Sequence, residues 1–243
     1  MNEYNLILLV VIPVLFVLGL RIKAFSREGA IASAIVGSLI IIGGGWLYFV
    51  MLFLFLGLSY ISTLSGFEKK KSWSLQEGLK GERGAKNVVA AGALPAAISL
   101  MNFWNFSPML IFFLYVVALG TILSDTAASE IGSLDENTYM ILTLKPAETG
   151  MNGGVSVLGT IVSFVFPIFF SLFGYIIYGG LISIPLGVLL KFAVLSGSLA
   201  FSGSLFDSVL GETLENRGYL TKYSVNFSAA LFATIVAFLL FVR

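Results

Sequence analysis

Two short acidic segments of the chain match one another in residue type and spacing. One runs from Asp125 to Glu130 and the other from Asp207 to Glu212; each begins with an aspartate followed by a hydroxyl residue, and each ends in a glutamate. Both follow an apolar stretch long enough to cross a bilayer. Carboxylates gathered at one membrane face repel one another unless a cation binds between them. The segments therefore predict a divalent metal site at a membrane surface, with these four acids as its ligands.

The composition indicates which chemistry is open to the chain. Of its 243 residues, 58% are hydrophobic and only 11% are charged, whereas a soluble domain has about 25% charged residues. We therefore expect an integral membrane protein, with no nucleic-acid partner. Cysteine and histidine are both absent, which excludes thiolate and imidazole chemistry. An enzyme of this composition would work with carboxylates, basic side chains, hydroxyls, backbone amides and a hard cation such as Mg²⁺.

The hydrophobic pattern predicts an all-α fold, a polytopic membrane helix bundle with about eight transmembrane helices in a single domain over residues 1–243. Helices are expected because lipid requires every backbone polar group to be satisfied internally. The first stretch lacks the basic start and cleavage site of a signal peptide, so it is interpreted as a helix. The predicted spans are 4–20, 29–45, 46–64, 87–103, 108–124, 154–177, 181–205 and 226–242.

The connections between these spans alternate between long polar loops and minimal turns. The polar loops are 21–28, 65–86, 125–153 and 206–225, and the turns lie at 43–45, 105–107 and 178–180. All lysines and arginines except Lys191 and Arg243 lie in the polar loops. The positive-inside rule then predicts that the polar side is cytoplasmic and that both termini lie outside.

The region 154–205 can be divided into two helices or three. Three helices would place Asp207 and Asp125 on opposite sides, whereas two keep them on one face and use Tyr178-Gly179-Gly180 as the turn. With two helices Lys191 falls inside a span. An intramembrane lysine indicates a functional role, unless its side chain extends to an interface.

A glycine-rich turn on the polar side has the composition of a phosphate-binding loop. Residues Thr149 to Gly154 contain Asn152, Gly153 and Gly154 and lead into a predicted helix, whose N-terminal amides would favour an anion. The alternative is an ordinary loop. Asn87 and Asn226 stand at predicted helix starts, where they act either as N-caps or as groups that face a ligand.

The loop 65–86 is basic. Its run Lys69-Lys70-Lys71 fits a patch that binds lipid headgroups, while Lys80 continues the basic character of the loop. Arg83 and Lys86 lie within one helical turn of Asn87, so we expect them to reach a phosphate near the acidic segments.

The two acidic segments indicate an internal duplication. Asp125 is followed by Asn152 at a predicted helix start, and Asp207 is followed by Asn226. Both copies cross the membrane in the same direction, so Asp125 and Asp207 are expected to face one cleft. Mg²⁺ is commonly held by one or two carboxylates together with phosphate oxygens. The alternative is that the acids are solvated helix caps.

Several of these motifs together resemble an integral membrane family that includes plant phytyl-phosphate kinase. The resemblance covers about residues 21–242 and rests on the segments 83–87, 124–132, 150–156, 203–211 and 225–226. It implies transfer of a phosphoryl group from a nucleotide, with CTP preferred, to an isoprenoid monophosphate. It also implies kinship with phytol and dolichol kinases.

The resemblance also implies roles for individual residues. Asp125, Glu130 and Asp207 would act in catalysis by handling the metal and the phosphates. The nucleotide and its phosphates would be bound by Arg83, Lys86, Asn87, Thr149, Asn152, Gly153, Gly154 and Asn226. Met151 departs from the family pattern, which favours a polar residue at this position.

Two other functions stay open at this stage. Another lipid-phosphate enzyme, such as a cytidylyltransferase or a polyprenol kinase, would use the same metal and phosphate chemistry. A transporter would place its polar site near the midplane and often shows inverted repeats, and Lys191 is the feature that favours it. The sequence leaves the acceptor's chain length and the nucleotide open.

Overall fold

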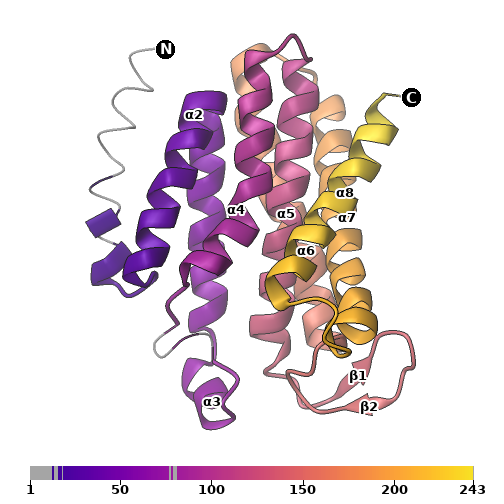
Figure 1. Ribbon diagram of the computed structural model, residues 1–243. Helices are drawn as coiled ribbons and strands as arrows, with labels where there is room; N and C mark the ends of the chain where they lie inside the picture. The colour runs from indigo at the N-terminus through magenta and orange to yellow at the C-terminus, as the bar shows by residue number, and fades with distance from the viewer. Residues whose placement is uncertain (1–12, 14–15, 18, 77, 79–80, 243) are drawn as a thin grey trace.

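The computed structural model describes residues 13, 16–17, 19–76, 78 and 81–242. The predicted span 4–20 falls mostly outside these residues, as do Lys80 and Arg243. Helices dominate the described chain (Figure 1). They are α2 (Arg27–Leu64), α3 (Phe67–Ser72), α4 (Ala85–Leu100), η1 (Met101–Phe103), α5 (Pro108–Gly132), α6 (Val157–Ile182), α7 (Leu186–Leu210), the π-helical η2 (Gly211–Glu215) and α8 (Lys222–Phe241).

The fold is all-α, but the described residues contain five candidate membrane-spanning helices and not about eight: α2, α5, α6, α7 with η2, and α8. The two spans predicted at 29–45 and 46–64 correspond to the two halves of α2, which is interrupted at Gly45, where the spans were predicted to meet. The helix predicted at 87–103 is present as α4 followed directly by η1, but α4 itself has 16 residues, whereas a bilayer requires about 20.

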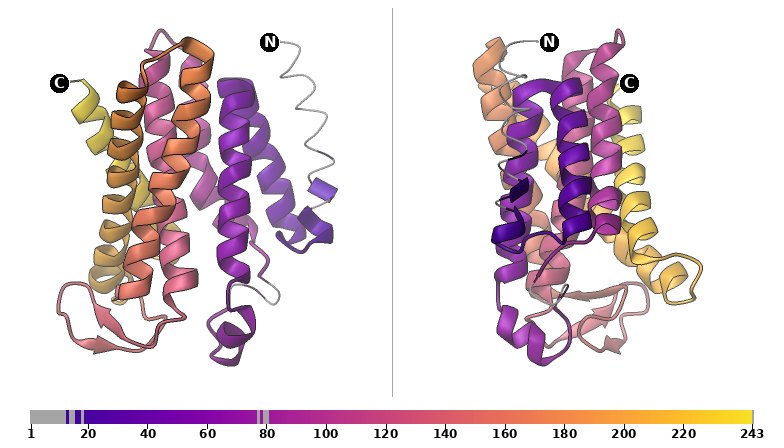
Figure 2. Two further views of the ribbon diagram at one scale, coloured as in Figure 1. Left: turned by 180° about the vertical axis from the view of Figure 1, so that it is seen from behind. Right: turned by 60° about the vertical axis from the view of Figure 1, so that its left-hand side comes forward.

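The interruption in α2 reverses the direction of the chain. Gly45 has φ 74°, a conformation that glycine adopts without steric cost. Ser26, at the start of α2, donates its backbone N–H to the carbonyl oxygen of Arg83 at 3.1 Å, and the guanidinium of Arg83 donates to Thr63 near the end of α2 at 2.9 Å. Both ends of α2 therefore lie at one side, and its two halves run side by side as a hairpin (Figure 2).

Helix α5 is the centre of the bundle. It packs against α2, α4, α6, α7 and α8, and the residues from Ile111 to Leu119 are each at most 3% exposed. A helix that is apolar on all sides is typical of such a buried position. The outer helices instead expose large apolar side chains such as Phe164 and Val194, which form a surface suited to lipid.

The region 154–205 contains two helices, as predicted, but the turn lies elsewhere. Tyr178, Gly179 and Gly180 continue α6, because the apolar pattern extends through them. The chain turns at Ser183, which has φ 53°, just before Pro185. Helix α5 likewise continues past its predicted end at residue 124 as far as Gly132, so Asp125 is helical and does not lie in a loop.

Close helix packing brings the polar ends of α5, α7 and α8 together. A Cβ atom at Gly203 of α7 would lie 2.6 Å from Cγ2 of Thr121 on α5 and 2.9 Å from Cβ of Ala233 on α8. Only a residue without a side chain permits this approach, which is how small residues act in membrane helix packing.

Lys191 lies near the opposite end of α7 from Asp207. The helix begins at Leu186, so Lys191 falls in its second turn, and the residue is exposed. This position agrees with a side chain that reaches an interface. The end of α8 lies at the opposite end of the bundle from the strands β1 and β2 (Figure 1).

A small sheet lies between α5 and α6, in the second part of the predicted loop 125–153 and the first residues of the predicted span 154–177. It comprises β1 (Thr138–Met140), β2 (Pro146–Ala147) and β3 (Gly154–Ser156), antiparallel and in the order β2-β1-β3. Strands this short carry no periodic pattern that a sequence would reveal. The sheet lies at the end of the bundle where α5 finishes (Figure 1).

Candidate functional site

A polar cavity of about 220 Å³ lies between the ends of α5, α7 and α8 and the small sheet. Asp125 and Asp207 both line it, and the charge of one acts electrostatically on the other. The amide nitrogen of Asn226, in the orientation that satisfies its neighbours, donates to Asp207 Oδ2 at 3.2 Å and to the carbonyl oxygen of Lys222 at 2.9 Å. The structure therefore brings two carboxylates from the two acidic segments into one site.

Lys222 and Glu215 also line this cavity, and sequence reasoning did not single them out as site residues. Both act electrostatically on Asp125 and Asp207. Glu215 ends the π-helical turn η2, and such turns often occur at functional sites. Three carboxylates close to one ammonium group leave an excess of negative charge, which favours a cation. The sequence did contain a signal for Glu215: it lies about two helical turns after Asp207, so a continuing helix would place both side chains on one face.

The glycine-rich turn is docked against the end of α7. Gly153 has φ 80°, and a Cβ atom there would lie 2.5 Å from the backbone nitrogen of Glu212. A Cβ atom at Gly211 would lie 2.7 Å from the backbone nitrogen of Gly153. Asn152, Gly153 and Gly154 line the cavity, whereas Thr149 does not. The glycines thus allow two backbones to meet beside the acidic pair.

The sequence predicted that the glycine-rich turn leads directly into a helix. In the structure β3 lies between the turn and α6. Helix α6 begins at Val157, and its N-cap Ser156 accepts a hydrogen bond from the backbone of Gly159 at 3.1 Å. Asp135 accepts from the backbone of Leu158 at 3.4 Å and of Asn137 at 3.0 Å, and the second of these bonds holds the pKa of Asp135 below its ordinary value. The protein itself therefore satisfies amides at this helix start.

Glu130 lies in a buried ion cluster. Its carboxylate accepts from Lys70 Nζ at 2.5 Å and from Arg83 at 3.0 Å, and also from the hydroxyl of Thr63 at 3.2 Å. It is 6% exposed. Glu130 borders the polar cavity, but both of its oxygens are engaged, so the predicted metal-ligand role conflicts with this geometry. Breaking a buried pair typically costs about 3–5 kcal/mol.

Lys70 contradicts the predicted lipid-binding patch at Lys69–Lys71. It is fully buried and donates to the carbonyl oxygen of Thr63 at 2.8 Å as well as to Glu130. A lysine run usually indicates an exposed surface, and nothing in the run distinguishes its middle residue. Lys69 pairs with Glu136 at 3.3 Å.

Four further predicted residues do not line the polar cavity. Glu212 accepts from the backbone of Leu142 at 2.8 Å and does not line the cavity. Lys86 is exposed and, like Arg83 and Asn87, is not among the lining residues.

The two asparagines that were predicted at helix starts lie inside their helices. Asn87 is the third residue of α4, and Asn226 is the fifth of α8, which Thr221 caps. Neither asparagine is therefore an N-cap.

The donor set at the cavity fits Mg²⁺ that is shared with a substrate. Among residues 13–242 that the structure describes, no three acidic side chains are placed to hold one ion by themselves, so the four-ligand site predicted from the sequence is not assembled. Mg²⁺ usually takes one or two protein carboxylates and completes its shell with water and phosphate oxygens. Asp125 and Asp207 satisfy that requirement.

Long apolar helices around a buried central helix, with a polar cavity at one end, define an integral membrane protein. The family model described as integral membrane protein DUF92 matches residues 10–234. The chain belongs to this family.

Three relatives from distant organisms are similar over most of the chain. An uncharacterized membrane protein of Methanocaldococcus jannaschii is 31% identical over 96% of this chain and 94% of its own length. An uncharacterized membrane protein of Synechocystis is 32% identical over 75% of this chain and 69% of its own. The chloroplast protein VTE6 of Arabidopsis thaliana is 27% identical over 93% of this chain and 68% of its own. No solved structure matches the chain.

Proposed function

We propose that this protein is a membrane phosphotransferase that uses a nucleoside triphosphate, with CTP preferred, to convert an isoprenoid monophosphate into the diphosphate. The observation that carries the proposal is the convergence of Asp125 and Asp207 in one cavity, beside Lys222 and a glycine-rich turn. The resemblance of these motifs to the family that includes plant phytyl-phosphate kinase supports the same chemistry.

Each residue of the cavity has a role in this proposal. Asp125 and Asp207 hold Mg²⁺, which neutralises phosphate charge when it is bound. Asn226 orients the carboxylate of Asp207 through its 3.2 Å hydrogen bond. Lys222 binds a phosphate oxygen, and Asn152, Gly153 and Gly154 line the same cavity. A strong general base is unnecessary, because the acceptor phosphate is already anionic.

The proposed active face is cytoplasmic, because the basic residues concentrate at the end of the bundle that holds the cavity. A transporter is a weaker candidate. Transporters place their sites near the bilayer midplane, whereas this cavity lies where α5 and α7 end. A cytidylyltransferase or a polyprenol kinase would use the same residues and differ in acceptor and product.

The test is a phosphoryl-transfer assay on protein purified in detergent. Geranylgeranyl monophosphate and Mg²⁺ are supplied with each nucleoside triphosphate in turn, and lipid products are resolved by mass spectrometry. The proposal predicts a Mg²⁺-dependent prenyl diphosphate with CTP as the best donor. Intact protein that forms no diphosphate from any nucleotide or prenyl phosphate would contradict it, and a cytidylated lipid would identify the second candidate.

A further inference from the structure

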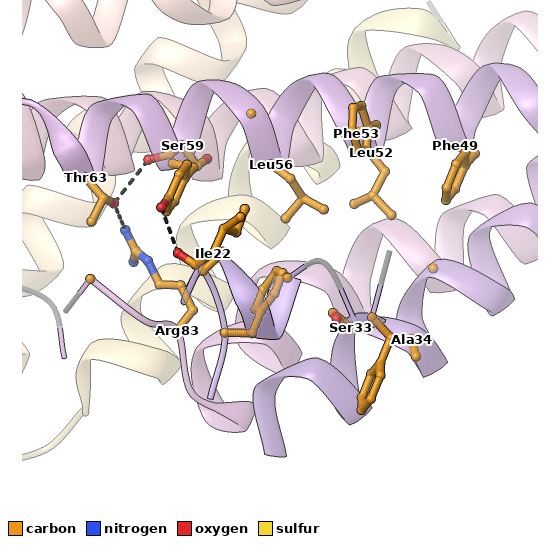
Figure 3. A pocket seen from close by; sticks show the side chains of 18 residues that line it. Ile22, Ser33, Ala34, Phe49, Leu52, Phe53, Leu56, Ser59, Thr63 and Arg83 are labelled. Carbon is orange, nitrogen blue, oxygen red and sulfur yellow. Dashed lines mark hydrogen bonds between the residues drawn. The ribbon is translucent and has the colours of Figure 1, made fainter. Parts of the chain in front are cut away.

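A second cavity, of about 360 Å³, lies between the two halves of α2 and residues that precede α2, among them Phe16, Ile22 and Phe25. Its walls are mainly apolar, with Leu52, Phe53 and Leu56 along one side (Figure 3). Phe49 lies toward one end, and Thr63 and Arg83 lie at the other. The helix rise of about 1.5 Å per residue makes this wall about 21 Å long from Phe49 to Thr63.

The polar end of this cavity carries positive charge. The side chain of Arg83 lines this end of the cavity. The backbone of Arg83 pairs with residues 24–26 as in a β-bridge, and its N–H donates to the carbonyl oxygen of Ala24 at 2.9 Å. Its guanidinium contacts Thr63 and Glu130, and Glu130 also contacts Lys70. Arg83 is the charged side chain among those that line this cavity, and a guanidinium is a typical partner for a phosphate group.

The same cluster joins the apolar cavity to the polar one. Arg83 lines the apolar cavity, while Glu130, which it contacts at 3.0 Å, lines the cavity of Asp125 and Asp207. Arg83 is also close enough to act electrostatically on Asp125. The ion pair of Arg83 and Glu130 therefore stands between the apolar cavity and the cavity that holds the acidic pair.

We infer that the apolar cavity holds the isoprenoid chain of the acceptor, with its phosphate at the Arg83 end. The inference rests on the proposed function and adds the location and size of the acceptor site. Ligand cavities commonly range over about 300–1,000 Å³, so this one suits a short prenyl chain such as farnesyl or geranylgeranyl better than a polyprenyl chain.

Photolabelling locates the chain without requiring turnover. The full chain, in nanodiscs and without nucleotide, is irradiated with farnesyl monophosphate that carries a diazirine at the far end of its chain, and adducts are mapped by mass spectrometry. We expect labelling on the wall around Phe49 and Phe53, suppressed by excess geranylgeranyl monophosphate. Labelling confined to other helices would overturn the inference. A phospholipid that carries a diazirine serves as a second probe. If it labels this wall and prenyl phosphate does not displace it, the inference is also overturned.

Two glycine substitutions supply a matched pair. Gly57 lines the apolar cavity and Gly180 lies on α6 outside it, and in both cases a Cβ atom would meet nothing within 4 Å. Gly57→Phe should weaken binding of farnesyl monophosphate by about tenfold or more, since apolar pockets discriminate on this scale. Gly180→Phe should bind as the wild type does. Equal binding by both variants would overturn the inference.

The two proposals fail in different ways. Labelling of the Phe49–Phe53 wall without diphosphate formation from any nucleotide supports the chain-binding site and contradicts the kinase. Diphosphate formation by Gly57→Phe with the wild-type KM, together with labelling elsewhere, supports the kinase and overturns the chain-binding site.

Discussion

Asp125 and Asp207 share one cavity, whereas the glutamates that close the same two sequence segments differ in their surroundings. Glu130, at the border of the same cavity, is held in an ion cluster, and Glu212 lies outside the cavity. Glu130 is buried between Lys70 and Arg83, and Glu212 accepts a backbone hydrogen bond beside the sheet. The aspartates face each other because α5 and α7 run in the same direction and end at the same level. Repetition in sequence thus indicates a shared function only for the residues that the helices bring together.

The largest effect is expected from removing either aspartate. Asp125→Asn and Asp207→Asn should each lower turnover by about a thousandfold, because a bound metal contributes several kcal/mol to the transition state. Each variant should fold, since it removes one of two repelling carboxylates. The phosphoryl-transfer assay, with thermal unfolding as the control, measures this effect. Wild-type turnover in either variant would place the chemistry elsewhere.

Glu130 should matter mainly to stability. Glu130→Ala leaves Lys70 and Arg83 without their carboxylate in a buried setting, and we expect a loss of about 3–5 kcal/mol in the free energy of unfolding. Thermal or denaturant unfolding in detergent measures the loss. If Glu130→Ala unfolds like the wild type but abolishes Mg²⁺-dependent turnover, then Glu130 acts in catalysis like Asp125 and Asp207. The distinction between catalytic aspartates and a structural glutamate would then be wrong.

Asn226 should have an intermediate effect. Asn226→Ala removes the hydrogen bond that orients Asp207, and loss of such a partner typically costs about 10- to 100-fold in metal affinity or activity. The Mg²⁺ concentration that gives half-maximal turnover should rise. An unchanged Mg²⁺ requirement would show that Asp207 is oriented by other contacts.

Glu212 should have the smallest effect. Glu212→Gln keeps an oxygen that can accept from Leu142, so stability should change by no more than about 1 kcal/mol, and turnover should match the wild type. The variant is also a charge-matched control for the aspartate variants. A large loss of activity in Glu212→Gln would extend the site beyond the cavity described above.

Much of the fold could be predicted because lipid restricts the spanning segments to apolar helices. The positions of α5, α6, α7 and α8 follow from the hydrophobic pattern, and the parallel repeat led to the expectation that Asp125 and Asp207 face one cleft. The described residues contain five candidate membrane-spanning helices and not about eight. The predicted span 4–20 lies mostly outside these residues, α4 is too short to qualify, and the spans 29–45 and 46–64 are the two halves of the single element α2.

The details missed at the site depend on tertiary contacts. Lys70 is indistinguishable from its two lysine neighbours until Glu130 is placed beside it. Glu215 faces the cavity at the end of a π-helical turn that no sequence pattern marks. The glycine-rich turn was interpreted as a helix start, whereas β3 separates Gly153 from α6.

Direct measurement of divalent-cation binding tests the central claim that Asp125 and Asp207 form one metal site. Mn²⁺, in place of Mg²⁺, is titrated into the purified protein with CTP present, and the bound ion is followed by electron paramagnetic resonance. The account predicts saturable binding in the wild type and in Glu212→Gln, and its loss in both Asp125→Asn and Asp207→Asn. Undiminished binding in the two aspartate variants would contradict it.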